Sequence, residues 1–129
     1  MTNPPFTVKD SGERQEFKTG AVRDMAAGKG RFDLISPIAL LRLAKWYEAG
    51  ARKYNDRNWE KGLPTGRCMD SALRHLNAYR LGHRDEDHLA AAMWNIAAII
   101  HIQHQVQAGK LPAELVQDEG PRYEEQPPS

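Results

Sequence analysis

Three carboxylates and an imidazole follow one another at residues 85–88 (Asp-Glu-Asp-His), directly before an apolar segment, residues 89–102, that contains no Lys or Arg. Residues 41–84 carry ten Lys and Arg against four Asp and Glu. Carboxylate oxygens bind hard divalent cations, and a basic band beside them neutralises phosphates. The alternative interpretation is a helix cap, because acids at a helix start favour the macrodipole and Asp85 is a suitable capping residue. The cluster therefore indicates a metal and phosphate site or a capped helix.

Glu48 is the second candidate for chemistry. Its i−4 and i−7 neighbours are Ala44 and Leu41, so the pattern predicts a carboxylate off the solvent face, at the edge of an apolar helix stripe. A carboxylate in that position is costly unless it is paired or bound to a metal. The competing interpretation is an i, i+4 ion pair with Arg52. We favour a functional role.

Three polar residues on predicted helix faces could extend this site. His75 lies on the inner stripe of the second helix, where a histidine is more often a hydrogen-bonded core residue than a metal ligand. Arg74 beside it either binds phosphate or forms a surface ion pair with Asp70. Asn95 shares a face with His88 in the apolar third helix and needs hydrogen-bond partners if it is buried.

The loop at residues 53–62 mixes cations, amides and two aromatic side chains. Aromatics stack on bases, amides read base edges and cations hold phosphate, so this composition suits a nucleotide. It also fits a platform for single-stranded nucleic acid. The residues of this loop predicted to bind substrate are Lys53, Tyr54, Asn58 and Trp59. In the N-terminal arm, Lys29 and Arg31 alternate with glycines and could add a phosphate contact, although this pattern is a weak signal.

Apolar spacing predicts three helices and an all-α fold that positions these residues. Residues 36–37 (Ser-Pro) are a strong helix start, a capping residue followed by proline at the first helical position. After a loop at about residues 54–65, the second helix should end at Gly82. The third should run over residues 86–108 as a central helix, because its apolar stripe is wide.

We expect one domain over residues 1–109, including an extended arm at residues 1–32 that packs on it, followed by a mobile, acidic, Pro-rich tail at residues 110–129. No segment shows the two-residue period of a strand. Three helices bury little apolar surface for a chain of 129 residues. A homodimer or higher homo-oligomer is therefore expected to complete the helical bundle.

The composition restricts the cellular compartment in which the protein is expected to work. Cys68 is the single cysteine, so no intrachain disulfide is possible and a reducing cytoplasm is expected. The first residues lack the basic and apolar regions of a secretory signal. The longest apolar stretch is interrupted by polar residues such as Asn95, which argues against a membrane span.

With these residues set out, the chain resembles the phage dATP/dGTP diphosphohydrolase N-terminal family, a distant relative of the MazG-like all-α nucleotide pyrophosphohydrolases. The resemblance covers about residues 19–100. It rests on residues 19–24, 28–34, 47–50, 53–62, 71–75 and 85–91 together with Trp94-Asn95.

The resemblance implies hydrolysis of a purine deoxynucleoside triphosphate, dGTP or dATP, to the monophosphate and pyrophosphate with Mg²⁺ or Mn²⁺, in remodelling of a phage nucleotide pool in the host cytoplasm. On this hypothesis Glu48 and Asp87 are catalytic, and Glu86 faces solvent. The hypothetical metal ligands are Glu48, His75, Asp85, Asp87 and His88. The hypothetical substrate-binding residues are Lys29, Arg31, Lys53, Tyr54, Asn58, Trp59, Arg74 and Asn95.

Three other functions compete with this hypothesis. A broad house-cleaning nucleoside triphosphate pyrophosphatase is the closest. A non-catalytic phage nucleic-acid-binding protein would use the basic band, but the near-neutral net charge of +1 and the acidic start of the third helix count against it. A purely structural dimeric bundle would simply pair its buried polar residues with one another.

Overall fold

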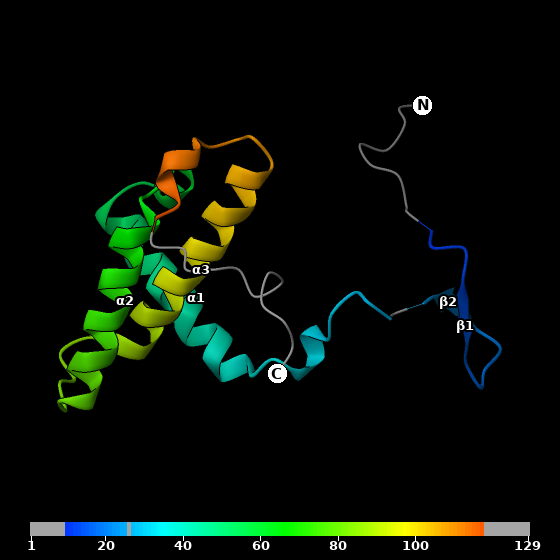
Figure 1. The fold of residues 1–129 in the computed structure, drawn as a ribbon. Helices are drawn as coiled ribbons and strands as arrows, with labels where there is room; N and C mark the ends of the chain where they lie inside the picture. Colours follow the sequence, from blue (N-terminus) through cyan, green and yellow to red (C-terminus); the bar gives the residue numbers. More distant parts are fainter. Residues whose placement is uncertain (1–9, 26, 118–129) are drawn as a thin grey trace, which may run out of the picture. The chain divides into compact units, whose positions relative to one another are not determined.

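The computed structural model describes residues 10–25 and 27–117. The chain divides into two compact units, residues 1–35 and 36–129. The second unit contains three long helices, α1 (Pro37–Lys53), α2 (Thr65–Arg80) and α3 (His88–Gln107) (Figure 1). The first contains two short antiparallel strands, β1 (Arg14–Glu16) and β2 (Val22–Asp24). The predicted all-α class is confirmed, and the short hairpin, whose strands have three residues each, was not predicted from the sequence.

Local signals set the helix ends. Ser36 caps α1, because its hydroxyl accepts a hydrogen bond from the Ala39 N–H at 3.2 Å, and proline follows at the first helical position, as predicted. The start of α3 differs from the prediction. Asp87, not Asp85, is its capping residue, and its carboxylate accepts a hydrogen bond from the Ala90 N–H at 3.2 Å. The acids of the cluster therefore precede α3 and remain outside its first turn.

Helix α3 is central, because it packs against both α1 and α2. It runs antiparallel to α2, so that His75 lies opposite His88, and Ser71 opposite Asn95. Small side chains line most of this contact and let the two helices approach closely. The buried apolar residues are Cys68, Ala72, Ala90, Ala91, Ala92, Ala98, Ile99 and Ile102. None of the helices in the described part of the chain is long and apolar enough to cross a membrane.

The outer stripe of α3 is apolar, contrary to the usual pattern of a surface helix. Met93, Ile96 and Ile100 follow the i, i+3, i+7 spacing and are 38%, 46% and 61% exposed. No charged residue occurs anywhere in α3 apart from its histidines. A homo-oligomer was expected to complete the helical bundle, and in the described part of the single chain this stripe of α3 remains exposed.

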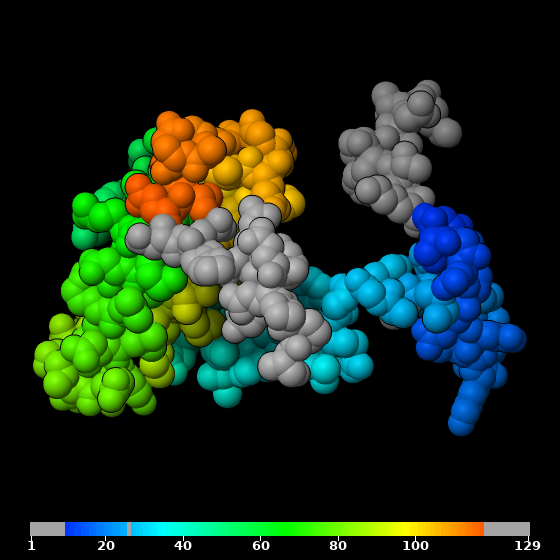
Figure 2. All heavy atoms as spheres, in the orientation of Figure 1, coloured from blue at the N-terminus to red at the C-terminus, as the bar shows by residue number. Residues whose placement is uncertain are grey.

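The first residues of the predicted tail pack on the helical unit. A short 3₁₀ helix, η3 (Ala113–Leu115), follows α3 and lies against the loop before α2; Figure 2 shows it in orange. The Thr65 hydroxyl donates to the carbonyl of Gln117 at 3.1 Å and accepts from its N–H at 2.7 Å. Residues 111–117 of the predicted tail thus contact the helical unit, residues 118–129 lie outside the described part, and the mobility of the tail stays a prediction.

Gly62 makes this contact possible, which gives a stability prediction. Its φ of +106° strains any L-residue, and an added Cβ would lie 2.8 Å from Leu115 Cδ1. We expect Gly62→Ala to lower the free energy of unfolding in urea by about 2 kcal/mol. Gly50→Ala is the matched control, because that helical position is open and has room for a Cβ; it should stabilise by up to about 1 kcal/mol. Equal effects of the two variants would contradict this account of Gly62.

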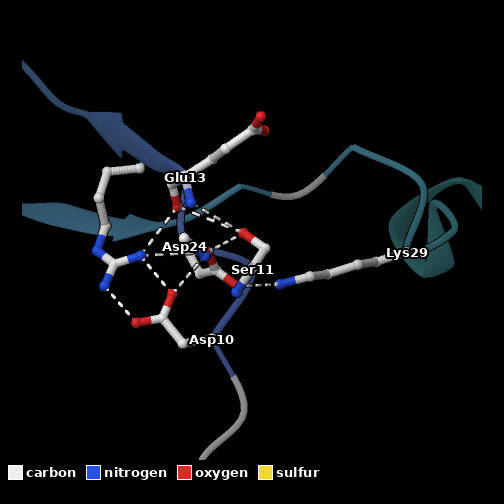
Figure 3. A network of polar contacts seen from close by, with 7 residues as sticks. Asp10, Ser11, Glu13, Asp24 and Lys29 are labelled. Atoms are coloured by element: carbon white, nitrogen blue, oxygen red, sulfur yellow. Dashed lines mark hydrogen bonds and ion pairs between the residues drawn. The ribbon is translucent and has the colours of Figure 1, made fainter.

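In the first unit, Asp24 organises the hairpin (Figure 3). Its carboxylate accepts hydrogen bonds from the Ser11 hydroxyl and N–H, which hold its pKa well below the usual range. The same carboxylate pairs with Lys29 Nζ at 3.3 Å. Arg31 forms a bidentate pair with Asp33, both bonds being 2.8 Å. Lys29 and Arg31, the two cations of the arm that were predicted to contact phosphate, thus each pair with a carboxylate of this unit. Packing of the arm on the helical domain stays a prediction.

Candidate active site

Two imidazoles and a carboxylate converge where α2 meets the start of α3. His75 Nδ1 lies 2.9 Å from His88 Nδ1. Glu86 Oε2 lies 4.0 Å from His75 Nδ1 and 3.9 Å from His88 Nδ1. His88 is buried and His75 is largely so, whereas the Glu86 side chain is half exposed. Antiparallel packing of α2 and α3 creates this cluster, because 13 residues of chain separate the two histidines.

Asp85 orients the inner histidine. Its carboxylate lies 2.9 Å from His88 Nε2, and this hydrogen bond holds the pKa of Asp85 below its usual value. An ionised carboxylate only accepts, so the His88 proton belongs on Nε2 and its Nδ1 presents a lone pair. That lone pair faces His75. Burial lowers the pKa of His75, although the nearby negative charge of Glu86 acts to raise it.

The surroundings hold these rings in place. Trp46 on α1 contacts the His75 ring edge-on, with ring centroids 5.9 Å apart. Asn95 is buried, as was considered from the sequence, and its amide donates to the Ala91 carbonyl at 2.9 Å and to the Ser71 hydroxyl at 3.3 Å. Its amide N–H groups thus bridge α2 and α3. The direct substrate contact predicted for Asn95 remains untested.

Asp87 is held by an arginine from another helix. Arg42 on α1 forms a bidentate pair with its carboxylate, at 2.8 Å and 2.5 Å, and this pair holds the pKa of Asp87 below its usual value. One of the same oxygens also caps α3. Both oxygens of Asp87 are therefore engaged, which leaves Asp87 less suited to bind a metal than Glu86.

A pocket of about 490 Å³ opens beside this cluster, within the size range of small-molecule sites. Arg84 stands in its wall, with its guanidinium 4.1 Å from the centre of the Tyr79 ring and with Nη1 bonded to the carbonyls of Tyr79 and His83. The lining residues are Arg42, Tyr79, Arg84, Asp85, Glu86, Asp87, His88 and Leu89. Cations, carboxylates and an imidazole thus face one space.

The donor set fits a divalent metal ion. Two ligand atoms that share one ion at about 2.1 Å cannot lie more than about 4.2 Å apart. The three distances among His75 Nδ1, His88 Nδ1 and Glu86 Oε2 satisfy this limit. Among the described residues these three form the group whose ligand atoms all lie close enough together.

Glu48 lies elsewhere. Its side chain is 64% exposed and pairs with Arg52 at 3.6 Å, so the prediction that it lies off the solvent face is wrong. It does not line the pocket. Arg74 likewise is exposed and pairs with Asp70 at 3.0 Å, which is the surface alternative considered from the sequence.

The loop predicted to read the base lies at the other end of α3. Trp59, in the 3₁₀ helix η2 (Asn58–Lys61), packs edge-on against His101 with ring centroids 4.7 Å apart. His101 follows His88 by 13 residues, or about 20 Å along the helix. Within η2, Asn58 is half-buried. Tyr54 is exposed beside Lys53, whose Nζ lies 5.4 Å from the ring centre. Within one chain, the loop and the pocket do not meet.

Comparison with known families decides the class of the protein. Residues 19–111 match the family described as dATP/dGTP diphosphohydrolase, N-terminal. The chain belongs to this family. The resemblance noted from the sequence is confirmed, and the protein is a nucleoside triphosphate diphosphohydrolase. No curated protein and no solved structure matches it.

In this diphosphohydrolase, four residues at the candidate site were not predicted from the sequence. Glu86 was assigned to solvent, although its place two residues before His88 puts both side chains at the helix start. Arg42, Tyr79 and Arg84 were not singled out at all. Arg84 adjoins the acidic cluster and could have been noticed on that ground. Arg42 carried no such signal, because only the packing of α1 on α3 brings it to Asp87.

Proposed function

We propose that the protein hydrolyses dGTP or dATP to the monophosphate and pyrophosphate in a metal-dependent reaction at the pocket before α3. The observation that carries this proposal is the convergence of His75, His88 and Glu86 beside the arginines of the pocket. Family membership supports the substrate class. Removal of normal purine deoxynucleotides by a phage enzyme in its host's cytoplasm is the role that we propose for this activity.

The metal would be held by His75, His88 and Glu86. When bound, a divalent ion neutralises phosphate charge and acts as a Lewis acid on the phosphoryl oxygens. Asp85 keeps His88 in the tautomer whose Nδ1 faces the site. In this assignment Asp85 and Asp87 are positioning residues, and Glu48 has no part in the site. These roles replace the ligand roles hypothesised for the three acids.

Arg42 and Arg84 would neutralise the triphosphate. Phosphoryl transfer depends chiefly on positioning and on stabilisation of charge, and a guanidinium offers five N–H donors for both. Hydrogen bonds to Asp87 hold the guanidinium of Arg42 in place, while the Tyr79 ring packs against the guanidinium of Arg84. Water then attacks the α-phosphorus, the bond from this phosphorus to the bridging oxygen breaks, and pyrophosphate leaves.

We further propose a homodimer in which the apolar stripe of α3, formed by Met93, Ile96 and Ile100, covers its own copy. A two-fold interface uses one patch on both subunits, and an uncharged apolar stripe is self-complementary. Antiparallel pairing near Ile96 would bring the loop at residues 53–62 of one copy toward the pocket of the other. The base-reading role of Tyr54, Asn58 and Trp59 depends on this arrangement.

A product assay tests the reaction. Purified protein is incubated with each dNTP and NTP in the presence of Mn²⁺, Mg²⁺ or chelator, and the nucleotides are resolved by ion-exchange chromatography. We expect dGTP or dATP to yield the monophosphate only when metal is present. Turnover of all nucleotides alike would indicate a broad house-cleaning enzyme, and turnover of none would refute the proposal.

A pair of isosteric variants separates the two candidate carboxylates. Glu86→Gln should lower turnover by at least about 100-fold, because it removes the anionic ligand, a loss of about 3 kcal/mol. Glu48→Gln should leave turnover within about twofold and stability within about 0.5 kcal/mol, because it removes only an exposed ion pair. Steady-state kinetics of both proteins give the answer. The opposite pattern would restore the catalytic role hypothesised for Glu48.

A further inference from the structure

The donor set also bears on which metal is bound. Two of its three members are imidazole nitrogens, and the third is a carboxylate oxygen. Mg²⁺ prefers an octahedron of oxygen ligands and keeps several waters, whereas imidazole suits the later first-row transition metals. Two histidines with one carboxylate are the ligands of catalytic Zn²⁺ sites and of non-haem Fe²⁺ sites.

Neighbouring side chains orient both imidazoles. Asp85 accepts the Nε2 proton of His88 at 2.9 Å, which is the carboxylate–histidine arrangement that orients metal-bound histidines and raises their basicity. His88 is buried, with 6% of its side chain exposed, so that orientation is fixed by packing as well. Trp46 restricts the second ring, that of His75. The two Nδ1 atoms come from opposite helices and lie 2.9 Å apart, hydrogen-bonded to each other, so one ion that displaces the shared proton can reach both.

We propose that this site, formed by His75, His88 and Glu86, selects a first-row transition-metal ion over Mg²⁺. This inference rests on the proposed function for its setting and refines it by naming the class of metal. Asp85 acts as a positioning residue behind His88. The expected order of affinity follows the Irving–Williams series, with Mn²⁺ weaker than Co²⁺ and Zn²⁺, and with Mg²⁺ at least about tenfold weaker than Mn²⁺.

Spectroscopy of the bound metal tests the ligand set without reference to activity. Mn²⁺ is added to the full-length protein, and pulsed electron paramagnetic resonance records nitrogen hyperfine couplings. We expect two coupled nitrogens in the unaltered protein and one in His75→Gln. His104→Gln, which changes an exposed histidine of α3, should keep both. The visible absorption of bound Co²⁺ provides a second readout with the same expected pattern.

Titrations of metal affinity complete the test. Glu86→Gln should weaken Mn²⁺ binding by at least about tenfold, and Asp85→Asn by about 10- to 100-fold with both nitrogen couplings retained. Glu114→Gln, an exposed glutamate of η3, should change nothing. Bound Mn²⁺ without nitrogen coupling, or equal affinity for Mg²⁺ and Mn²⁺, would overturn the inference.

The same measurements distinguish this inference from the proposed function. A two-nitrogen metal site in a protein that turns over no nucleotide would refute the function and uphold the metal assignment. Metal-dependent hydrolysis of dGTP or dATP with no nitrogen on the metal would do the reverse.

Discussion

His75→Gln is expected to lower kcat/KM for dGTP or dATP by at least about 100-fold while the helices remain folded. The substitution removes one of two imidazole ligands and leaves His88 and Glu86 with an incomplete set. His75 is only 16% exposed, but glutamine has a similar reach and retains polar atoms for the site. Steady-state kinetics with saturating metal, together with circular dichroism, measure the two effects separately.

His104→Gln provides the matched control for this prediction. It makes the same chemical change at an exposed position of α3, one turn beyond Ile100, and since glutamine is uncharged and of similar size, both dimerisation and turnover should stay within about twofold. If excess metal restores His75→Gln to full activity, the loss lies in metal affinity alone. Unchanged activity in His75→Gln at low metal concentration would remove His75 from the site.

Ile96→Glu is expected to convert the proposed dimer into a monomer. Burying an unpaired carboxylate at the centre of an apolar interface costs several kcal/mol, which raises the dimer dissociation constant by at least about 100-fold. Ile96 is 46% exposed in the single chain, so glutamate at this position is compatible with the folded monomer. Analytical ultracentrifugation over a range of concentrations gives the oligomeric state.

The matched control for the dimer is Ile38→Glu, at an exposed isoleucine in the first turn of α1. This variant should remain dimeric. In the Ile96→Glu monomer, metal binding should survive, because His75, His88 and Glu86 belong to one chain, whereas turnover should fall because the loop at residues 53–62 is lost from the site. A dimeric Ile96→Glu protein would exclude the α3 stripe as the interface. A fully active monomer would exclude the loop from substrate binding.

Features that depend on neighbouring residues were predictable from the amino-acid sequence alone. The Ser36 cap with its following proline started α1 where predicted, because capping is a local hydrogen bond. The helical periods gave the all-α class, and the motif residues gave the family. The candidate roles of His75 and His88 came from their types and positions on inner faces. The surface ion pair between Arg74 and Asp70, one of the two alternatives considered for Arg74, also followed from their i, i+4 spacing.

Which of these side chains meet depends on contacts between helices and could not be predicted from the sequence. Helical spacing placed Glu48 beside apolar neighbours, but among the described residues no other helix covers it, so the carboxylate remains in solvent with Arg52. Three adjacent acids looked equivalent as a sequence, yet each has a different partner: Asp85 has His88, Asp87 has Arg42, and Glu86 approaches both imidazoles. Such partners come from contacts between helices, whose relative rotation and offset depend on how the whole core packs and not on local sequence.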